Sequence, residues 1–111
     1  MLRESRNLGR LVVNAITFSE TAAHFQSYRE IHGALKIQDT ELEDLPWEAA
    51  YLAGHLHRQY RRAGGLRERV LPDFLIGAHA AVKGYRILTR DASRFRTYFP
   101  ELEIIAPDTH P

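Results

Sequence analysis

Apolar and polar residues alternate along the chain in blocks whose periods predict short strands separated by helices. Residues 11–16, LVVNAI, are almost continuously apolar and β-branched, which is typical of a buried parallel strand. Residues 17–33 repeat apolar side chains at near-helical spacing, so a helix is predicted that begins at Thr17 or Ser19 and ends at Gly33. The first third of the chain therefore predicts a strand followed by a helix.

The rest of the chain continues this alternation. A short strand is predicted near residues 42–45, and a helix follows Pro46, where apolar residues recur every three or four positions until Gly64. Residues 73–84, DFLIGAHAAVKG, predict an unusually apolar helix, and YRILT and LEIIA predict the last two strands. Alternating helices and strands predict an α/β fold with a mostly parallel sheet covered on both faces.

Length and composition limit the protein classes that fit. A chain of 111 residues with 44% hydrophobic content is long enough for one core, so a single domain over residues 1–111 is expected. The absence of cysteine excludes thiolate catalysis, disulfides and cysteine-based zinc sites, and fits a reducing compartment. Because no apolar run reaches about 18 residues and the first ten residues lack the apolar core of a secretory signal, a cytoplasmic protein is expected.

Charge is distributed unevenly although the net charge is only +1. Residues 39–48 hold five acids and no base, whereas residues 58–69 hold five arginines against Glu68: Arg58, Arg61, Arg62, Arg67 and Arg69. The arginines could face a polyanion, or they could be a solvated helix end whose cations complement the helix C-terminus.

Three acids lie at predicted element boundaries. Glu20 follows the first strand, Asp91 follows the strand YRILT, and Asp73 opens the apolar helix. Ligands of α/β sheets bind beyond the carboxyl ends of strands, so these acids predict a site for a hard cation such as Mg²⁺ or Mn²⁺. Asp73 joins this site only if the chain crosses back to that edge before its helix begins.

Each acid also has a purely structural interpretation. Asp73 could be an N-cap, Asp91 could cap a turn, and Glu20 could complement the helix dipole from a first turn. The six histidines offer no competing metal site, because His55 and His57 diverge on a helix and the others lack the spacing of a ligand pair.

Taken together, the motifs ITFSE, LPWEAAYLAGHLHRQYRRAGG, LPDFLIGAHAAVKGYRILTRD and RFRTYFPELEIIAP resemble the PIN-domain ribonucleases. The resemblance is strongest to the VapC toxins of bacterial toxin/antitoxin pairs and covers essentially the whole chain. It implies a three-layer fold with a central, mostly parallel sheet flanked by helices, in which the helix of Asp73 begins at the metal site.

The resemblance also implies an activity. It gives Glu20, Asp73 and Asp91 as ligands of Mg²⁺ or Mn²⁺, with the Thr89 hydroxyl nearby, and hydrolysis of RNA by a metal-activated water. The five arginines and Arg90 would attract the RNA backbone without reading its sequence. A cognate antitoxin would be the protein partner.

One departure from the family pattern lies at the start of the chain. PIN domains usually open with an apolar strand containing a Val-Asp-Thr-Asn pattern, whereas MLRESRNLGRLVV resembles the end of the family's second helix and the strand after it. The N-terminal strand and first acidic ligand are therefore expected to be missing. Because a missing interior strand leaves unpaired backbone groups, we expect self-association, exchange of elements between copies, or a rearranged sheet.

Two alternatives to a nuclease remain open. A PIN-like module without its first acid could bind a partner protein or RNA without catalysis. An unrelated α/β protein could carry the same acids only as helix caps, and substitution of Asp73 would then affect no activity.

Overall fold

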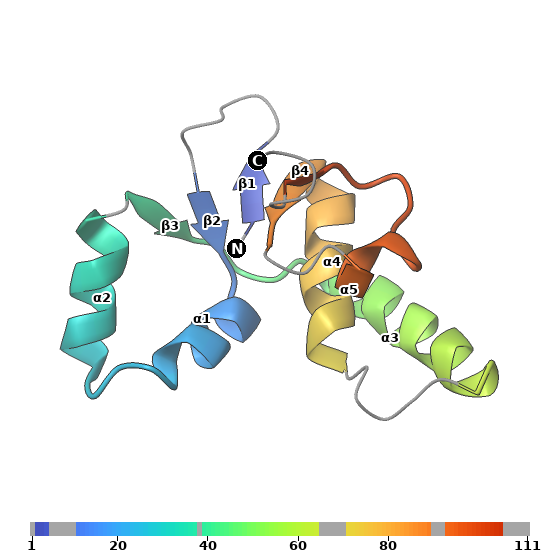
Figure 1. Ribbon diagram of the computed structural model, residues 1–111, viewed down its shortest axis with the longest axis horizontal. Coiled ribbons are helices and arrows are strands. Elements are labelled where there is room, and N and C mark those ends of the chain that lie inside the picture. Colours follow the sequence, from blue (N-terminus) through green and yellow to red (C-terminus); the bar gives the residue numbers. More distant parts are fainter. Residues whose placement is uncertain (1, 5–10, 38, 65–70, 90–92, 106–111) are drawn as a thin grey trace.

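The computed structural model describes residues 2–4, 11–37, 39–64, 71–89 and 93–105 (Figure 1). The elements follow the order β1 (Leu2–Glu4), β2 (Leu11–Val13), α1 (Ala15–Ala22), α2 (Tyr28–Ile37), β3 (Thr40–Leu42), α3 (Trp47–Arg62), α4 (Leu71–Lys83), β4 (Tyr85–Leu88), α5 (Ser93–Arg96) and β5 (Ile104–Ile105). The fold is mixed α/β, as predicted, with short strands.

The five strands form one sheet in the order β3-β2-β1-β4-β5. Strands β2 and β3 are parallel to each other, as are β4 and β5, whereas β1 is antiparallel to both of its neighbours. Strands β2, β3, β4 and β5 therefore all run in one direction, so their carboxyl ends lie at the same edge of the sheet. The prediction of a mostly parallel sheet is confirmed in part, because two of the four described strand pairings are parallel and two are antiparallel.

The predicted gap at the centre of the sheet is filled by the chain itself. Leu2 lies opposite both Val12 of β2 and Ile87 of β4, so β1 joins the two halves of the sheet. The centre of the sheet is not left open, because Leu2–Glu4 pairs with both neighbouring strands in the antiparallel sense. Of the three expected outcomes, this is the rearranged sheet, which pairs the backbone groups that would otherwise be buried without partners.

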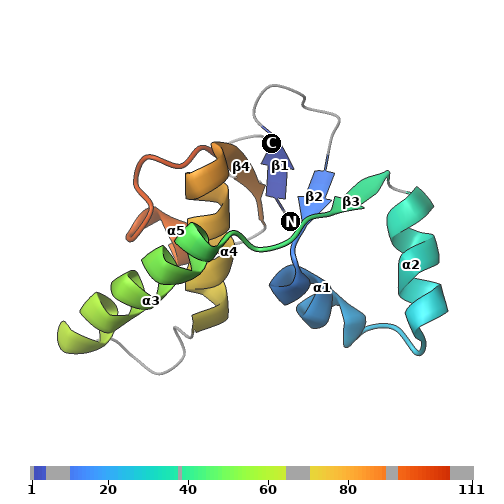
Figure 2. The same cartoon turned by 180° about the vertical axis from the view of Figure 1, so that it is seen from behind.

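Helices pack on both faces of the sheet. Val12 belongs to a core with Ala49 and Ala53 of α3 and with the apolar face of α4, whereas Val13 packs with Ile31 of α2. Successive strand residues point to opposite faces, so α3 and α4 cover one face and α2 the other. Figures 1 and 2 show this division, with α1 and α2 on one side of the strands and α3, α4 and α5 on the other.

The helix predicted between Thr17 and Gly33 is wrong in its bounds. The helical backbone begins at Ala15, because the side chain of Asn14 accepts hydrogen bonds from the amides of Ile16 and Thr17 and ends the strand earlier than expected. It stops at Ala22, and a new helix begins at Tyr28 and contains Gly33 in its interior. Two short helices replace the single long one.

The predictions for the second half agree more closely with the structure. Helix α3 begins directly after Pro46 and ends at Arg62, and α4 begins at Leu71, two residues before the predicted start. The predicted strand near residues 42–45 is found at Thr40–Leu42. None of the described helices is both long enough and apolar enough to cross a membrane.

Gly77 lets the segment after α5 pack closely on α4. A Cβ atom at this position would overlap the ring of Phe99, which is buried. Gly54 is also a helical glycine, but a Cβ there would meet nothing within 4 Å. The two glycines therefore have opposite roles, one required by packing and one that only weakens its helix.

We expect Gly77→Ala to lower the free energy of unfolding by about 1–3 kcal/mol, because the added methyl group overpacks the core against Phe99. Gly54→Ala should instead raise it by about 0.5–1 kcal/mol, because alanine is the better helix former at an exposed position. Urea unfolding of both variants measures the difference. Equal effects of the two substitutions would contradict the close packing at Gly77.

Candidate functional site

The candidate site lies at the sheet edge where the parallel strands end. Strand β2 passes directly into α1 through Asn14, and β4 ends at Leu88, just before Thr89. In both views α1 and the first turn of α4 lie beyond this same edge (Figures 1 and 2). Helix α4 therefore begins at the carboxyl ends of the strands, so Asp73, in its first turn, lies at this edge.

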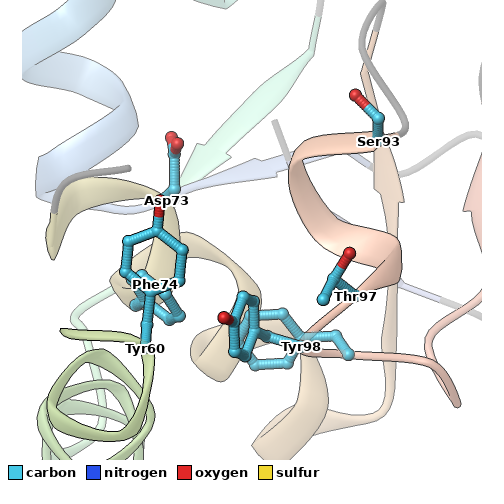
Figure 3. Close-up of a pocket in the computed structure, with 7 residues that line it drawn as sticks. Tyr60, Asp73, Phe74, Ser93, Thr97 and Tyr98 are labelled. Atoms are coloured by element: carbon cyan, nitrogen blue, oxygen red, sulfur yellow. The ribbon is translucent and has the colours of Figure 1, made fainter. Parts of the chain in front are cut away.

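Asp73 is a buried acid at the mouth of a pocket. Its side chain lies in the first turn of α4 and only 8% of the residue is exposed. It is the third residue of the helix, so the interpretation as an N-cap is wrong, although the positive end of the helix dipole still favours its charge. Figure 3 shows its carboxylate pointing away from the aromatic rings below it.

The pocket brings residues from three helices together. It has a volume of about 160 Å³ and is lined by Tyr60, Asp73, Phe74, Ser93, Thr97, Tyr98 and Phe99. The rings of Tyr60, Phe74 and Tyr98 form one cluster with centroid separations of 5.2–5.7 Å. The pocket therefore combines hydroxyl groups and one carboxylate with a wall of aromatic rings.

The structure gives less information on the other residues predicted for the metal site, Glu20, Thr89 and Asp91. Glu20 lies on the exposed surface in the second half of α1 rather than in its first turn, because the helix begins earlier than expected. The Thr89 amide donates to the Ile105 carbonyl at 3.0 Å, which fixes the backbone just after β4. Asp91 lies outside the described residues.

The donor chemistry suits a hard cation, but the described part of the chain supplies only part of the set. Carboxylate and hydroxyl oxygens are the ligands that Mg²⁺ prefers. Within residues 2–4, 11–37, 39–64, 71–89 and 93–105, no three acidic or histidine side chains are grouped to hold a metal. The residues fit the ion in kind, and the site would need Asp91 to complete the predicted trio.

Three of the predicted arginines gather on one surface. Arg58, Arg61 and Arg62 are exposed in the last turns of α3 and line a shallow depression with Gly54 and His57. The other arginines of the prediction, Arg67, Arg69 and Arg90, lie outside the described residues. The end of α3 therefore presents a basic surface formed by these three arginines. Their positive charges also complement the negative end of the helix dipole.

A buried polar network behind the site was not predicted. His79 of α4 has no exposed surface, and both of its ring nitrogens have partners: Nδ1 lies 2.9 Å from Asn14 Nδ2, and Nε2 lies 2.7 Å from Glu43 Oε2. Tyr85 donates its hydroxyl to the other oxygen of Glu43 at 2.7 Å. This network links the ends of β2 and β3 to α4 and β4.

The geometry fixes the tautomer of His79. Asn14 Oδ1 already accepts the amides of Ile16 and Thr17, both at 3.0 Å, so the Nδ2 amide must face His79. An amide nitrogen only donates, so Nδ1 of His79 accepts and carries no proton. The proton therefore sits on Nε2 and is donated to Glu43, which makes the imidazole neutral in this arrangement.

Glu43 is ionised more readily than an ordinary glutamate. Its partial burial opposes the charge, but the hydrogen bonds from Tyr85 and His79 outweigh burial and hold the pKa of Glu43 below its usual 4.5. Only 24% of its side chain is exposed. The network thus keeps one negative charge behind the candidate site, with two donors directed at it.

Sequence reasoning could have found only part of this network. A histidine in the middle of the most apolar helix is a sequence signal for a buried, satisfied polar group. Nothing in the spacing of Asn14, Glu43 and His79 indicates that they meet, because they lie up to 65 positions apart.

Comparison with known proteins identifies a similar fold but no protein family. No protein-family model and no curated protein matches the sequence. Among solved structures, this chain is similar to a chain in the crystal structure of VapBC2 from Rickettsia felis bound to a DNA fragment from their promoter. The TM-score is 0.63 at 17% sequence identity, and the match covers 86% of this chain and 73% of that chain.

The two chains share a fold. At 17% identity the likeness reaches no further than that.

We expect the stability of the folded chain to fall as the pH drops below 4.5, partly because of Glu43. The unfolded carboxyl takes up a proton near its ordinary pKa, whereas the folded carboxylate resists protonation to lower pH, so the unfolded state binds more protons in this window. Glu43→Gln should therefore flatten the fall measured by urea unfolding between about pH 6 and about pH 3.5. At neutral pH it should cost about 1–3 kcal/mol, because two donors lose their charged acceptor.

Tyr51→Phe is the control for this measurement, because it removes a hydroxyl from an exposed tyrosine on α3. Its pH profile should follow that of the unsubstituted chain. A Glu43→Gln profile equally steep as the original would contradict a lowered pKa in the folded state.

Proposed function

We propose that the chain is a Mg²⁺- or Mn²⁺-dependent endoribonuclease of the VapC type, which hydrolyses RNA phosphodiester bonds. Asp73 and Glu20, with Asp91, would hold the metal, and the Thr89 hydroxyl would lie close to it. When bound, the ion would lower the pKa of a water molecule and neutralise charge that develops at phosphorus. Such a protein requires no nucleophilic side chain, which agrees with a chain without cysteine.

The observation that carries this proposal is the position of Asp73. Its carboxylate is buried in the first turn of a helix, beside a pocket, at the carboxyl edge of the sheet, which is where ligands of α/β sheets bind. An acid that served only as an N-cap would lie before the helix rather than in it. The fold shared with a VapBC2 chain supports the same assignment.

The partner of such a nuclease would be a cognate antitoxin protein. Two large aromatic residues on α3, Trp47 and Tyr51, are 88% and 77% exposed, and exposed aromatic residues are typical of protein interfaces. Association with a second copy of the chain remains a further prediction. The exposed pair supports a surface that binds protein, without indicating which protein binds.

A catalytically silent PIN-like module is the second candidate function. The observation that favours it is the position of Glu20, which lies on the exposed surface in the second half of α1 rather than in the first turn. The strand β1 fills the central position of the sheet in the antiparallel sense, so it does not follow the path of the family's first strand. Such a module would keep the RNA-binding surface and the partner surface.

We expect the purified chain to cut a mixed single-stranded RNA in Mg²⁺ or Mn²⁺ and to stop when EDTA is added. Asp73→Asn should lower the cleavage rate at least about 100-fold, because even residues that only orient a metal ligand contribute about 10–100-fold. Glu20→Gln should also lower it. Rates are measured on end-labelled RNA, with circular dichroism as the check that each variant is folded.

Asp44→Asn is the matched control, because Asp44 is an exposed acid before α3 and lies outside the pocket. It should cut RNA at the original rate. Cleavage that survives Asp73→Asn would contradict the nuclease assignment, and a folded chain that never cuts RNA would favour the silent module.

We expect the arginines at the end of α3 to attract RNA through its phosphates. Replacement of Arg58, Arg61 and Arg62 by alanine should weaken binding to a single-stranded RNA and reduce the slope of log affinity against log salt by about 0.7 for each arginine in contact. Fluorescence anisotropy in EDTA measures this without cleavage. Arg29→Ala, on the exposed surface of α2, is the control, and an unchanged slope in the triple variant would place the RNA elsewhere.

A further inference from the structure

The pocket beside Asp73 contains a tyrosine hydroxyl that the fold itself does not use. Tyr60 of α3 is 9% exposed, so its ring is part of the core. Its hydroxyl has no hydrogen-bond partner among the residues that the structure describes, yet Tyr60 lines the pocket. Figure 3 shows this ring rising from α3 with its hydroxyl directed toward Asp73.

The Tyr60 hydroxyl is not sealed in the core, because it is absent from the buried side-chain polar atoms that lack a hydrogen-bond partner in the described part of the chain. Solvent therefore reaches it through the pocket, where it is available to a ligand. A phenylalanine would pack equally well against Phe74 and Tyr98, whose ring centroids lie 5.7 and 5.3 Å from that of Tyr60. The hydroxyl is therefore not required by the packing of the core, and it can serve a ligand that displaces solvent from the pocket.

Two more hydroxyls line the same space. Thr97 is exposed at the pocket wall and Tyr98 is half-buried, and neither has a hydrogen-bond partner within the described part of the chain. Three hydroxyls of this kind both donate and accept, so they suit a ligand that presents donors and acceptors together. The rings of Tyr60, Phe74 and Tyr98 add flat apolar surface beneath them.

We propose that this pocket binds one unstacked nucleoside of the RNA, next to the phosphodiester bond that is cut. The base would lie against the aromatic cluster, and its polar edge and the ribose would bond to the hydroxyls of Tyr60, Thr97 and Tyr98. Unstacked bases in single-stranded RNA are recognised in this way, by aromatic stacking and by hydrogen bonds to base edges and sugar hydroxyls.

The size of the pocket agrees with this ligand. At about 160 Å³ it is smaller than the roughly 300 Å³ at which pockets for drug-sized molecules begin, and it therefore suits a single base or nucleoside. A phosphate alone is disfavoured, because among the lining residues Asp73 is an acid and the others are neutral.

This inference rests on the proposed nuclease function, since it assigns a substrate position beside Asp73. It also predicts a sequence preference, because a pocket with fixed donors and acceptors accepts some bases better than others. The arginines of α3 would hold the backbone and the pocket would select the base, so affinity and selectivity would come from different residues.

The test measures nucleoside binding in EDTA, so that it does not depend on cleavage. Adenosine, guanosine, cytidine and uridine are titrated separately against the full chain, and binding is followed by saturation-transfer NMR. At least one nucleoside should bind, and Tyr60→Phe and Thr97→Val should each raise its dissociation constant at least about fivefold, the loss expected for one hydrogen bond.

Both substitutions keep the shape of the side chain, and thermal unfolding verifies that the variants remain folded. Tyr28→Phe, which removes a hydroxyl from an exposed tyrosine on α2 outside the pocket, should leave the dissociation constant unchanged. Absence of binding by all four nucleosides, or equal binding to Tyr60→Phe and the original chain, would overturn the inference. Because neither outcome involves cleavage, failure of the pocket and failure of the nuclease assignment are distinguishable.

Discussion

The hydrogen bond between Asn14 and His79 is the contact on which the arrangement of the candidate site depends. Asn14 ends β2 and caps α1, so its amide oxygen is committed to two backbone amides and its amide nitrogen has one direction left. His79 occupies that direction at 2.9 Å from the middle of α4. Since His79 is fully buried, water cannot replace either partner, and the pair holds the two helices in one relative position.

The site acids depend on this contact through rigid helices. Asp73 precedes His79 by six residues, which is about 9 Å along a helix axis, and Glu20 follows Asn14 by the same number of residues. Fixing His79 therefore fixes how far α4 extends beyond the sheet edge and where Asp73 meets the pocket. Glu43 completes the link, because it holds the other nitrogen of the imidazole and lies between β3 and α3.

The centre of the sheet depends on the three residues of β1, Leu2–Glu4. Two parallel strand pairs need a partner between them, and β1 supplies it by pairing with Val12 on one side and Ile87 on the other. Antiparallel pairing was not indicated by the sequence, because Leu2–Glu4 has no alternating pattern long enough to be predicted as a strand. Backbone hydrogen bonding, rather than side-chain pattern, selected this arrangement.

By itself, the sequence determined the class of fold and the chemistry available to it. The apolar periods of residues 47–62 and 71–83 and the β-branched run at 11–13 specify helices and strands locally, and the acid at Asp73 could be identified because a charge in an apolar segment needs a reason. Tertiary structure alone decided which polar groups meet. Asn14, Glu43 and His79 join across three elements, and Tyr60 reaches the pocket of Asp73 from another helix. Such contacts follow from how helices dock on a sheet, which no local period records.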